Sequence, residues 1–301
     1  MNRSAFLLAA LLAACATPKE QPGFETADEA ARQMVQALRT DNLVQAEEFL
    51  GEGSAELLHS GDDVADRNGR AEFVRLYDEK HRLEQVNETT MTLCIGEIDW
   101  PVPIPIVKSG EIWVFDTAAG REEMLNRRIG RNELNAIQVC LAYCDAQREY
   151  GAADHDGDGV LEYARAFRSS PGKHDGLYWP VKEGEPSSPL GELAAQAVKE
   201  GYGGKTGDDG PHPYHGYYYR ILTSQGRHAA GGAYSYMVKD QMIGGYALVA
   251  YPAEYGNSGV MSFQVDHDGT VFQKDLGDDT ANAAEAMKTF DPDPSWKAVS
   301  E

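Results

Sequence analysis

The sequence predicts an α+β protein, and three patterns lead to that fold class. Apolar residues recur at helical spacing near the N-terminus, as at Ala31, Val35 and Leu38. Later stretches alternate apolar with polar residues, as strands do, and Asp268-Gly269 is a hairpin signal between two of them. The chain has 301 residues, of which 42% are hydrophobic and 25% charged. That length and composition allow one large domain or two of ordinary size.

The first residues have the features of an export signal. Arg3 precedes the apolar run Ala5–Ala14, which is too short to span a bilayer because a spanning helix takes about 20 residues. The run suits the apolar part of a secretory signal. It ends in Leu12-Ala13-Ala14-Cys15, which resembles the bacterial lipobox. The resemblance implies that residues 1–14 are removed and that Cys15 receives a diacylglycerol and an acyl chain such as palmitate.

An acylated Cys15 would make the lipid bilayer the first partner of the protein, since several acyl chains anchor a protein stably. In Gram-negative lipoproteins an Asp after the cysteine usually retains the protein in the inner membrane. Ala16 therefore favours the outer membrane, with the body facing the periplasm. Residues 15–25 would be a lipid-anchored tether. The alternative is an ordinary secretory peptide that contains a cysteine by chance.

The net charge of −21 restricts the partners further. A body this acidic repels phosphate backbones, so we expect no nucleic acid partner. The charge also gives no help in docking on anionic lipid headgroups. It fits solubility and the binding of divalent cations.

Residues 26–131 are predicted to form the first of two domains, beginning with three helices. Thr26-Ala27-Asp28-Glu29 is a capping box that opens the first helix. Asn42 with Gln45 resembles a second N-cap, which opens a helix through Leu50. A third helix is expected over residues 70–84. Its apolar stripe would be Phe73, Leu76, Tyr77 and Leu83.

Strands are expected after these helices. Met91, Leu93 and Ile95 alternate with polar or small residues. Prolines at 101, 103 and 105 cannot donate to a ladder, which predicts an edge strand or extended chain. A turn at Lys108-Ser109-Gly110 leads into the apolar strand Ile112–Phe115. Helices followed by a curved antiparallel sheet resemble the cone of nuclear-transport-factor-like domains.

Residues 132–301 are predicted to form the second domain. A helix over 132–150 would have one side made of Leu134, Ile137, Leu141, Cys144 and Arg148. An acidic loop, a helix near Leu190–Gly201 and a Gly-rich loop at 201–210 follow. Four β-rich runs complete the domain: Tyr217–Thr223, Met242–Tyr251, Val260–Val265 and Thr270–Gln273. A long helix with a four-stranded antiparallel sheet resembles the head of type IV pilin-like proteins.

Three cysteines follow the leader, namely Cys94, Cys140 and Cys144. Cys140 and Cys144 share one face of the predicted helix with nearly parallel Cβ vectors, which disfavours a bridge between them. Two alternatives therefore remain for the cysteines. Cys94 forms a disulfide with Cys140 or Cys144, or all three are buried free thiols.

Several stretches together resemble an uncharacterised bacterial family known as domain of unknown function 2950. They are Phe115–Glu123, Asn126–Glu133, Asp175–Pro180 and Tyr214–Tyr218. The resemblance covers nearly all of the chain after the leader. It is consistent with a lipoprotein and implies no established activity.

The stretch Asp154–Glu162 fits the start of a calcium loop. Asp154, Asp156 and Asp158 are spaced as the first three oxygen ligands of such a loop, and Gly159 stands where the backbone must turn sharply. Three carboxylates so close together repel one another, and a divalent cation would remove that repulsion. The sequence therefore predicts a Ca²⁺ site with a structural role.

Two further ligands are expected, and one expected ligand is missing. Val160 would offer its carbonyl, and Glu162 its carboxylate, directly or through water. Arg165 stands where an EF-hand needs a bidentate Glu, so this loop is not an EF-hand. The alternative is an acidic, glycine-rich solvated turn.

A run of aromatic residues is the best candidate for a recognition surface. It consists of Tyr214, His215, Tyr217, Tyr218 and Tyr219. Tyrosines are favoured in interfaces and stack on sugars. Neighbours on a strand face opposite ways, so half of the run is expected to pack into the core.

These observations favour a non-enzymatic envelope lipoprotein with a calcium-stabilised loop, whose partner is an envelope protein or a wall polymer. The competing hypothesis is an envelope hydrolase or lyase with its site in the C-terminal half. That hypothesis needs a cleft that gathers groups such as Glu122, Asp175, His215 and Arg220.

Overall fold

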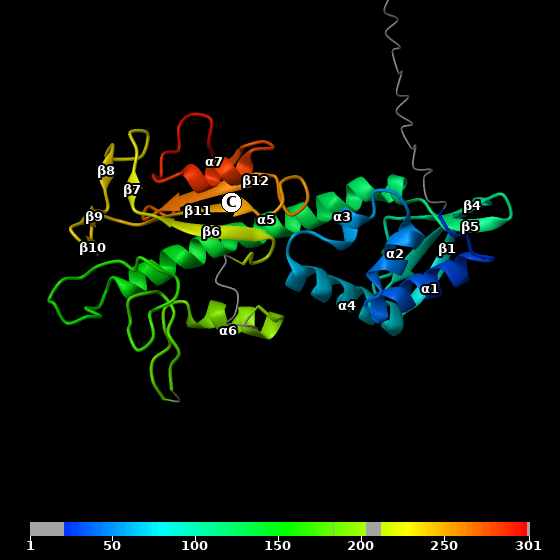
Figure 1. The fold of residues 1–301 in the computed structure, drawn as a ribbon, viewed down its shortest axis with the longest axis horizontal. Coiled ribbons are helices and arrows are strands. Elements are labelled where there is room, and N and C mark those ends of the chain that lie inside the picture. Colours follow the sequence, from blue (N-terminus) through cyan, green and yellow to red (C-terminus); the bar gives the residue numbers. More distant parts are fainter. Residues whose placement is uncertain (1–20, 183, 203–211, 300–301) are drawn as a thin grey trace, which may run out of the picture.

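A single helix of 34 residues, α5 (Thr117–Tyr150), joins two α+β halves (Figure 1). The computed structural model describes residues 21–182, 184–202 and 212–299. The predicted signal and Cys15 lie outside these residues, as does most of the Gly-rich loop at 201–210. The α+β class is confirmed, whereas the cone-like and pilin-like resemblances stay predictions.

Four helices open the N-terminal half: α1 (Ala27–Arg39), α2 (Leu43–Leu50), α3 (Ala55–Leu58) and α4 (Asp63–Glu79). Both predicted caps are present. Thr26 Oγ1 accepts from the Glu29 N–H at 3.1 Å, and Asn42 Oδ1 accepts from the Gln45 N–H at 3.3 Å. The helix expected over 70–84 starts earlier, because the Asp62 carboxylate caps it, and it ends before Leu83.

The sheet of this half is antiparallel, in the order β1-β2-β4-β5, with β3 paired to β2. Its strands are β1 (His81–Asn87), β2 (Thr90–Ile95), β3 (Trp100–Pro101), β4 (Ile106–Ser109) and β5 (Ile112–Phe115). Strand β1 was missed because nearly all its side chains are exposed and show no apolar alternation. The predicted edge strand is present as the short strand β3, after which the Pro-rich segment bends at Pro103 and Ile104.

Helix α5 begins at Thr117, capped by Asp116, well before the predicted start at 132. Its predicted apolar side is wrong in part, since Leu134 is 66% exposed and Leu141 is also exposed. The buried side carries Ala136, Cys140, Tyr143, Gln147 and Tyr150. The spacing of the leucines could not reveal that α5 faces the second sheet with small side chains and tyrosines.

The second sheet has the order β14-β13-β12-β11-β6 and is antiparallel. Its strands are β6 (Tyr217–Leu222), β11 (Ala247–Pro252), β12 (Met261–Asp266), β13 (Phe272–Asp275) and β14 (Lys297–Ala298). The run predicted over 242–251 is interrupted at Gly244 and Gly245, so β11 starts later. The Asp268-Gly269 hairpin between β12 and β13 is confirmed.

Two helices cover this sheet from opposite faces: α5 and α7 (Thr280–Ala286). Residues of β6 alternate between them. Tyr219 lines a cavity together with Tyr143 of α5, whereas Arg220 donates to the carbonyls of Ala284 and Met287 at the end of α7. Helix α6 (Gly191–Glu200) lies on the α5 side (Figure 1). Two small ribbons pair β7 (Ser224–Gln225) with β8 (Tyr234–Ser235) and β9 (Met237–Val238) with β10 (Gln241–Met242).

The three cysteines of the described residues are free and buried. Cys140 and Cys144 belong to the core of the second half, and Cys94 lies on β2. Burial raises the pKa of each thiol, that of Cys144 to about 12. They therefore act as small apolar side chains. No helix within the described residues is both long and apolar enough to cross a membrane.

Candidate functional site

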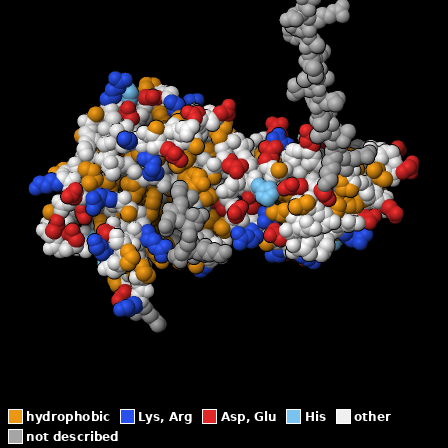
Figure 2. All heavy atoms as spheres, viewed as in Figure 1, with side chains coloured by type: hydrophobic (Ala, Val, Ile, Leu, Met, Phe, Trp, Pro, Cys, Tyr) orange, Lys and Arg blue, Asp and Glu red, His pale blue; other side chains and the backbone are white. Residues whose placement is uncertain are grey.

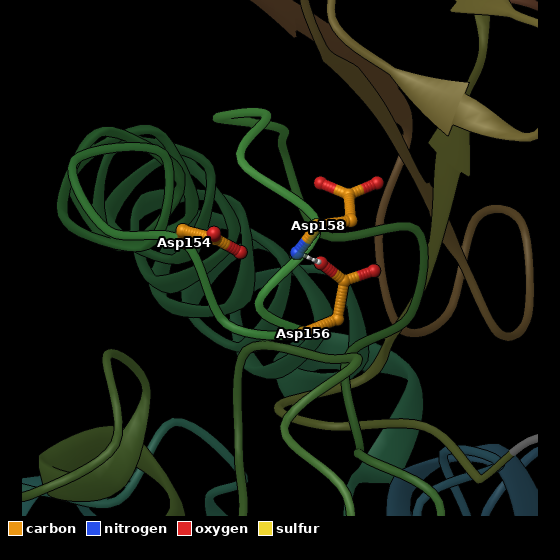
Figure 3. A group of neighbouring side chains, drawn as sticks. All are labelled: Asp154, Asp156 and Asp158. Carbon is orange, nitrogen blue, oxygen red and sulfur yellow. Dashed lines mark hydrogen bonds between the residues drawn. The ribbon is translucent and has the colours of Figure 1, made fainter.

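The three aspartates of the acidic loop come together as their spacing predicts (Figure 3). Carboxylate oxygens of Asp154, Asp156 and Asp158 all lie within 4.8 Å of one another, and all three residues are exposed. The Asp158 N–H donates to Asp156 Oδ1 at 3.3 Å. The group therefore offers a cluster of hard oxygen ligands of the kind that Ca²⁺ prefers.

The backbone of the loop turns around Asp154. Its Oδ1 accepts from the Gly157 N–H at 2.7 Å, and its Oδ2 accepts from the Gly159 N–H at 2.9 Å. Both glycines have positive φ, 79° and 87°, which side chains with a Cβ rarely adopt. These hydrogen bonds hold the pKa of Asp154 below its usual value.

The two remaining predicted ligands lie differently. The Val160 N–H donates to Asp158 Oδ1 at 2.8 Å, which closes the turn. Glu162 is half-buried and does not belong to the aspartate group, and its Oε2 has no hydrogen-bond partner among the described residues. Burial first, and the charge of Asp156 next, raise the pKa of Glu162. Gln241 from β10 donates to Asp158 Oδ2 at 2.5 Å.

None of the tyrosines in the predicted recognition run is fully exposed. Tyr217 is buried and donates to the Met261 carbonyl at 2.8 Å. Tyr218 is half-buried beside Tyr251, with ring centroids 5.6 Å apart. Tyr219 faces α5, where burial raises its pKa well above the usual value. Tyr214 and Tyr219 also line a cavity of about 300 Å³ beside α6.

The four groups named for a hydrolase lie apart. Glu122 is exposed on α5, and Asp175 accepts from the Ser170 N–H at 2.7 Å in a surface loop. Arg220 bonds to carbonyls at the end of α7, and His215 pairs with Glu200. No hydrogen bond or ion pair of the described chain joins any two of the four.

A large hollow lined mainly by the N-terminal half was not predicted from the sequence. It is a cavity of about 710 Å³, a size typical of small-molecule sites. Its apolar wall comes from helices and strands far apart in the chain: Met34, Leu57, Phe73, Ile95, Trp100 and Ile104. Sequence periodicity marked several of these residues as core, but it could not indicate that their side chains leave space between them.

One end of this cavity is polar and is built from both halves. Arg128, Arg131 and Asn132 of α5 line it together with Tyr202 and His215. Asn132 donates to the Ser258 carbonyl at 2.9 Å, so the helix is fixed to the second half there. The stretches Asn126–Glu133 and Tyr214–Tyr218, far apart in the sequence, therefore meet at this end.

Asp62 connects the halves behind the polar end. This carboxylate is 1% exposed. It caps α4 and accepts from the Tyr202 hydroxyl at 2.9 Å and from the Gly216 N–H at 2.8 Å. Gly216 has a φ of 77°, and a Cβ there would lie 2.5 Å from Asn132 Nδ2. The approach of the two segments thus requires glycine at this position.

His215 is held in a constrained conformation at the same end. Its φ of 52° is uncommon for a residue other than glycine. Its Nε2 lies 3.2 Å from Glu200 Oε2, and its ring packs on Tyr214 and Tyr202. Burial lowers the pKa of His215, an effect that the charge of Glu200 opposes.

The surface around these sites is mixed in charge. Figure 2 shows acidic side chains over both halves of the face in view, with basic side chains among them. The acidic side chains on this face are therefore not gathered in one patch.

Comparison with known proteins identifies a family. The family described as "Protein of unknown function (DUF2950)" matches residues 21–299, nearly the whole chain. The chain therefore belongs to this family. No curated protein matches the chain significantly, and no solved structure does so either.

Proposed function

We propose that this member of the DUF2950 family is a lipid-anchored protein of the bacterial envelope that binds a small molecule without transforming it. The leader and Cys15 support the anchor. The body would face the periplasm, at the outer membrane rather than the inner one. Cells fed labelled palmitate should label the wild type but not Cys15→Ser. Equal labelling of the two proteins, or an uncleaved leader, would refute the anchor.

The observation that carries the binding role is the cavity of about 710 Å³ in the N-terminal half. An apolar hollow with a few polar groups at one end is the usual form of a small-molecule site. Binding of an envelope protein or a wall polymer by the outer surface of the protein stays a prediction. The cavity supports a small molecule better, since its volume and its largely apolar lining suit one.

Gly69 offers a way to block the cavity without disturbing the fold. It lies on α4, lines the cavity, and has no atom within 4 Å of the position of a Cβ. Glycine also weakens a helix interior, so a larger residue there should not destabilise α4. Gly130 on α5 is equally unobstructed and does not line the cavity. The two glycines form a matched pair.

The test uses N-phenylnaphthylamine, an uncharged probe that fluoresces in apolar surroundings. The wild type and Gly130→Trp should bind it saturably and with the same affinity, and Gly69→Trp should not. Equal binding by both variants would place the probe elsewhere and would remove the binding role of the cavity.

We further propose that the acidic loop binds Ca²⁺ as a structural ion. The support is the gathering of Asp154, Asp156 and Asp158 around a turn with two positive-φ glycines. A ligand bound only by the folded state raises the melting temperature with its concentration. Calcium should raise that temperature in the wild type and not in Asp156→Ala. An equal response of both proteins to calcium and to chelator would exclude this site.

A further inference from the structure

The large cavity has two chemically different ends, which restricts the ligand. The apolar end is formed by side chains without hydrogen-bonding groups, among them Met34, Leu93 and Ile104. The other end contains Arg131, Asn135 and His215. A ligand that fills the whole cavity therefore needs an apolar body and a polar head, because an apolar wall gives no hydrogen bonds to a polar body.

Two of the three acidic groups that line the cavity have hydrogen-bond or ion-pair partners, whereas Glu200 Oε2 accepts no hydrogen bond from the described residues. Asp66 accepts from the Ser60 hydroxyl at 2.6 Å and from the Ser60 N–H at 2.8 Å. Glu72 pairs with Arg75 on the same helix at 2.8 Å. Glu200 lies 3.2 Å from His215. A cationic ligand would have to compete with these contacts for the carboxylates of Asp66 and Glu72.

Most basic groups of the lining also have partners within the protein. Arg70 pairs with Asp41 at 3.1 Å. Arg127 pairs with Glu123 at 2.6 Å and lies over the Trp100 ring. The guanidinium of Arg128 is satisfied by the carbonyls of Glu56 and Leu57 and by Asn257. These three side chains therefore stabilise the wall of the cavity, and their hydrogen bonds are used within the protein.

Arg131 differs from them. No hydrogen bond or ion pair holds its guanidinium within the part of the chain that the structure describes. The charge of Arg131 lowers the pKa of both Arg128 and His215, which shows that these side chains lie near it. Arg131 is exposed, so its guanidinium lies where the cavity meets solvent. An Arg in that place matches an anionic head, to which it can donate two parallel hydrogen bonds.

We infer that the cavity takes a long-chain fatty acid, with the carboxylate on Arg131 and the alkyl chain among the apolar side chains. This inference rests on the proposed binding function. A single negative charge suits this end better than the double charge of a phosphate monoester. Glu200 and Asp66 line the cavity too, and each would repel a second charge on the ligand.

The test compares three ligands that share one alkyl chain: oleate, oleyl alcohol and oleyl phosphate. Each is titrated below its aggregation concentration against bound N-phenylnaphthylamine. Oleate should bind about tenfold more tightly than oleyl alcohol, as expected for one charge-assisted contact. Oleate should also bind more tightly than oleyl phosphate. Arg131→Ala should remove the advantage of oleate and leave the alcohol unchanged.

Arg148→Ala is the control, because Arg148 is an exposed residue of the same helix outside the cavity. It should leave all three affinities unchanged. Equal binding of oleate and oleyl alcohol, tighter binding of oleyl phosphate, or an unaltered oleate affinity in Arg131→Ala would overturn the inference. Probe binding that Gly69→Trp abolishes would still support the cavity in those cases. Probe binding that Gly69→Trp leaves intact would instead refute the proposed function itself.

Discussion

The two halves of the molecule use the same kinds of elements and fill their interiors differently. In the second half, α5 and the sheet enclose fully buried aromatic side chains such as Tyr143, Tyr246 and Phe263, and the cavity beside α6 is only about 300 Å³. In the N-terminal half the helices and the sheet leave a cavity of about 710 Å³. A filled core contributes stability, whereas a wall around empty space lacks the contacts that facing atoms would give it. The larger unfilled volume therefore lies on the side of the N-terminal half.

Truncating one phenylalanine in each half should give the largest difference in the free energy of unfolding between the two halves. Phe263→Ala removes a fully buried ring and should lower the free energy of unfolding by about 3–5 kcal/mol. Phe73 is half-buried and lines the cavity, so Phe73→Ala should cost only about 1 kcal/mol. Chemical denaturation measures both values. Losses of equal size would mean that the N-terminal half is as tightly filled as the second.

The junction between the halves should be nearly as sensitive. Asp62→Ala removes the cap of α4 and leaves the Gly216 N–H and the Tyr202 hydroxyl without their acceptor. We expect a loss of about 2–4 kcal/mol in the free energy of unfolding. Asp116→Ala is the matched control, since Asp116 caps α5 without such a role, and it should cost about 1 kcal/mol. Similar losses for the two variants would argue against a coupling role for Asp62.

The smallest effect concerns the response to acid. Burial lowers the pKa of His215 in the folded state below its ordinary value of 6.5. Stability from neutral His215 is therefore present above that value and is lost as the pH falls through the folded-state pKa. Glu200, Asp62 and Arg131 are the charged groups that act on this ring.

His215→Asn tests that effect and keeps a residue that tolerates positive φ. Melting temperatures are compared between about pH 7.5 and about pH 5.5, on either side of the ordinary pKa of histidine. The wild type should lose more stability on acidification than the variant. A larger loss in the variant would mean that Glu200 outweighs burial and that the pKa is raised.

Local signals in the sequence were sufficient where the structure depends on neighbouring residues. The caps at Thr26 and Asn42 and the acidic loop at Asp154–Asp158 form as expected, because each needs only residues a few positions apart. The sequence also predicted the α+β class and the family. Strand β1 carries no apolar alternation, so nothing in its sequence set it apart from the preceding helix.

The cavity could not be predicted for a different reason. Phe73 and Leu76 were correctly assigned to the inward side of a helix. Whether side chains opposite them close the space depends on residues such as Ile95, Trp100 and Met124, which other elements bring there. Hydrophobic periodicity gives the direction of a side chain and not the distance to its neighbour.

Methionine methyl groups can report directly on the difference between the halves. Met34 and Met124 line the cavity, whereas Met242 is buried in the core of the second half. Titration of ¹³C-methyl-labelled protein with oleate should shift the Met34 and Met124 signals saturably and leave the Met242 signal in place. The assignment of ligand binding to the cavity of the N-terminal half would be contradicted if the Met34 and Met124 signals did not move. It would also be contradicted if the Met242 signal moved with them.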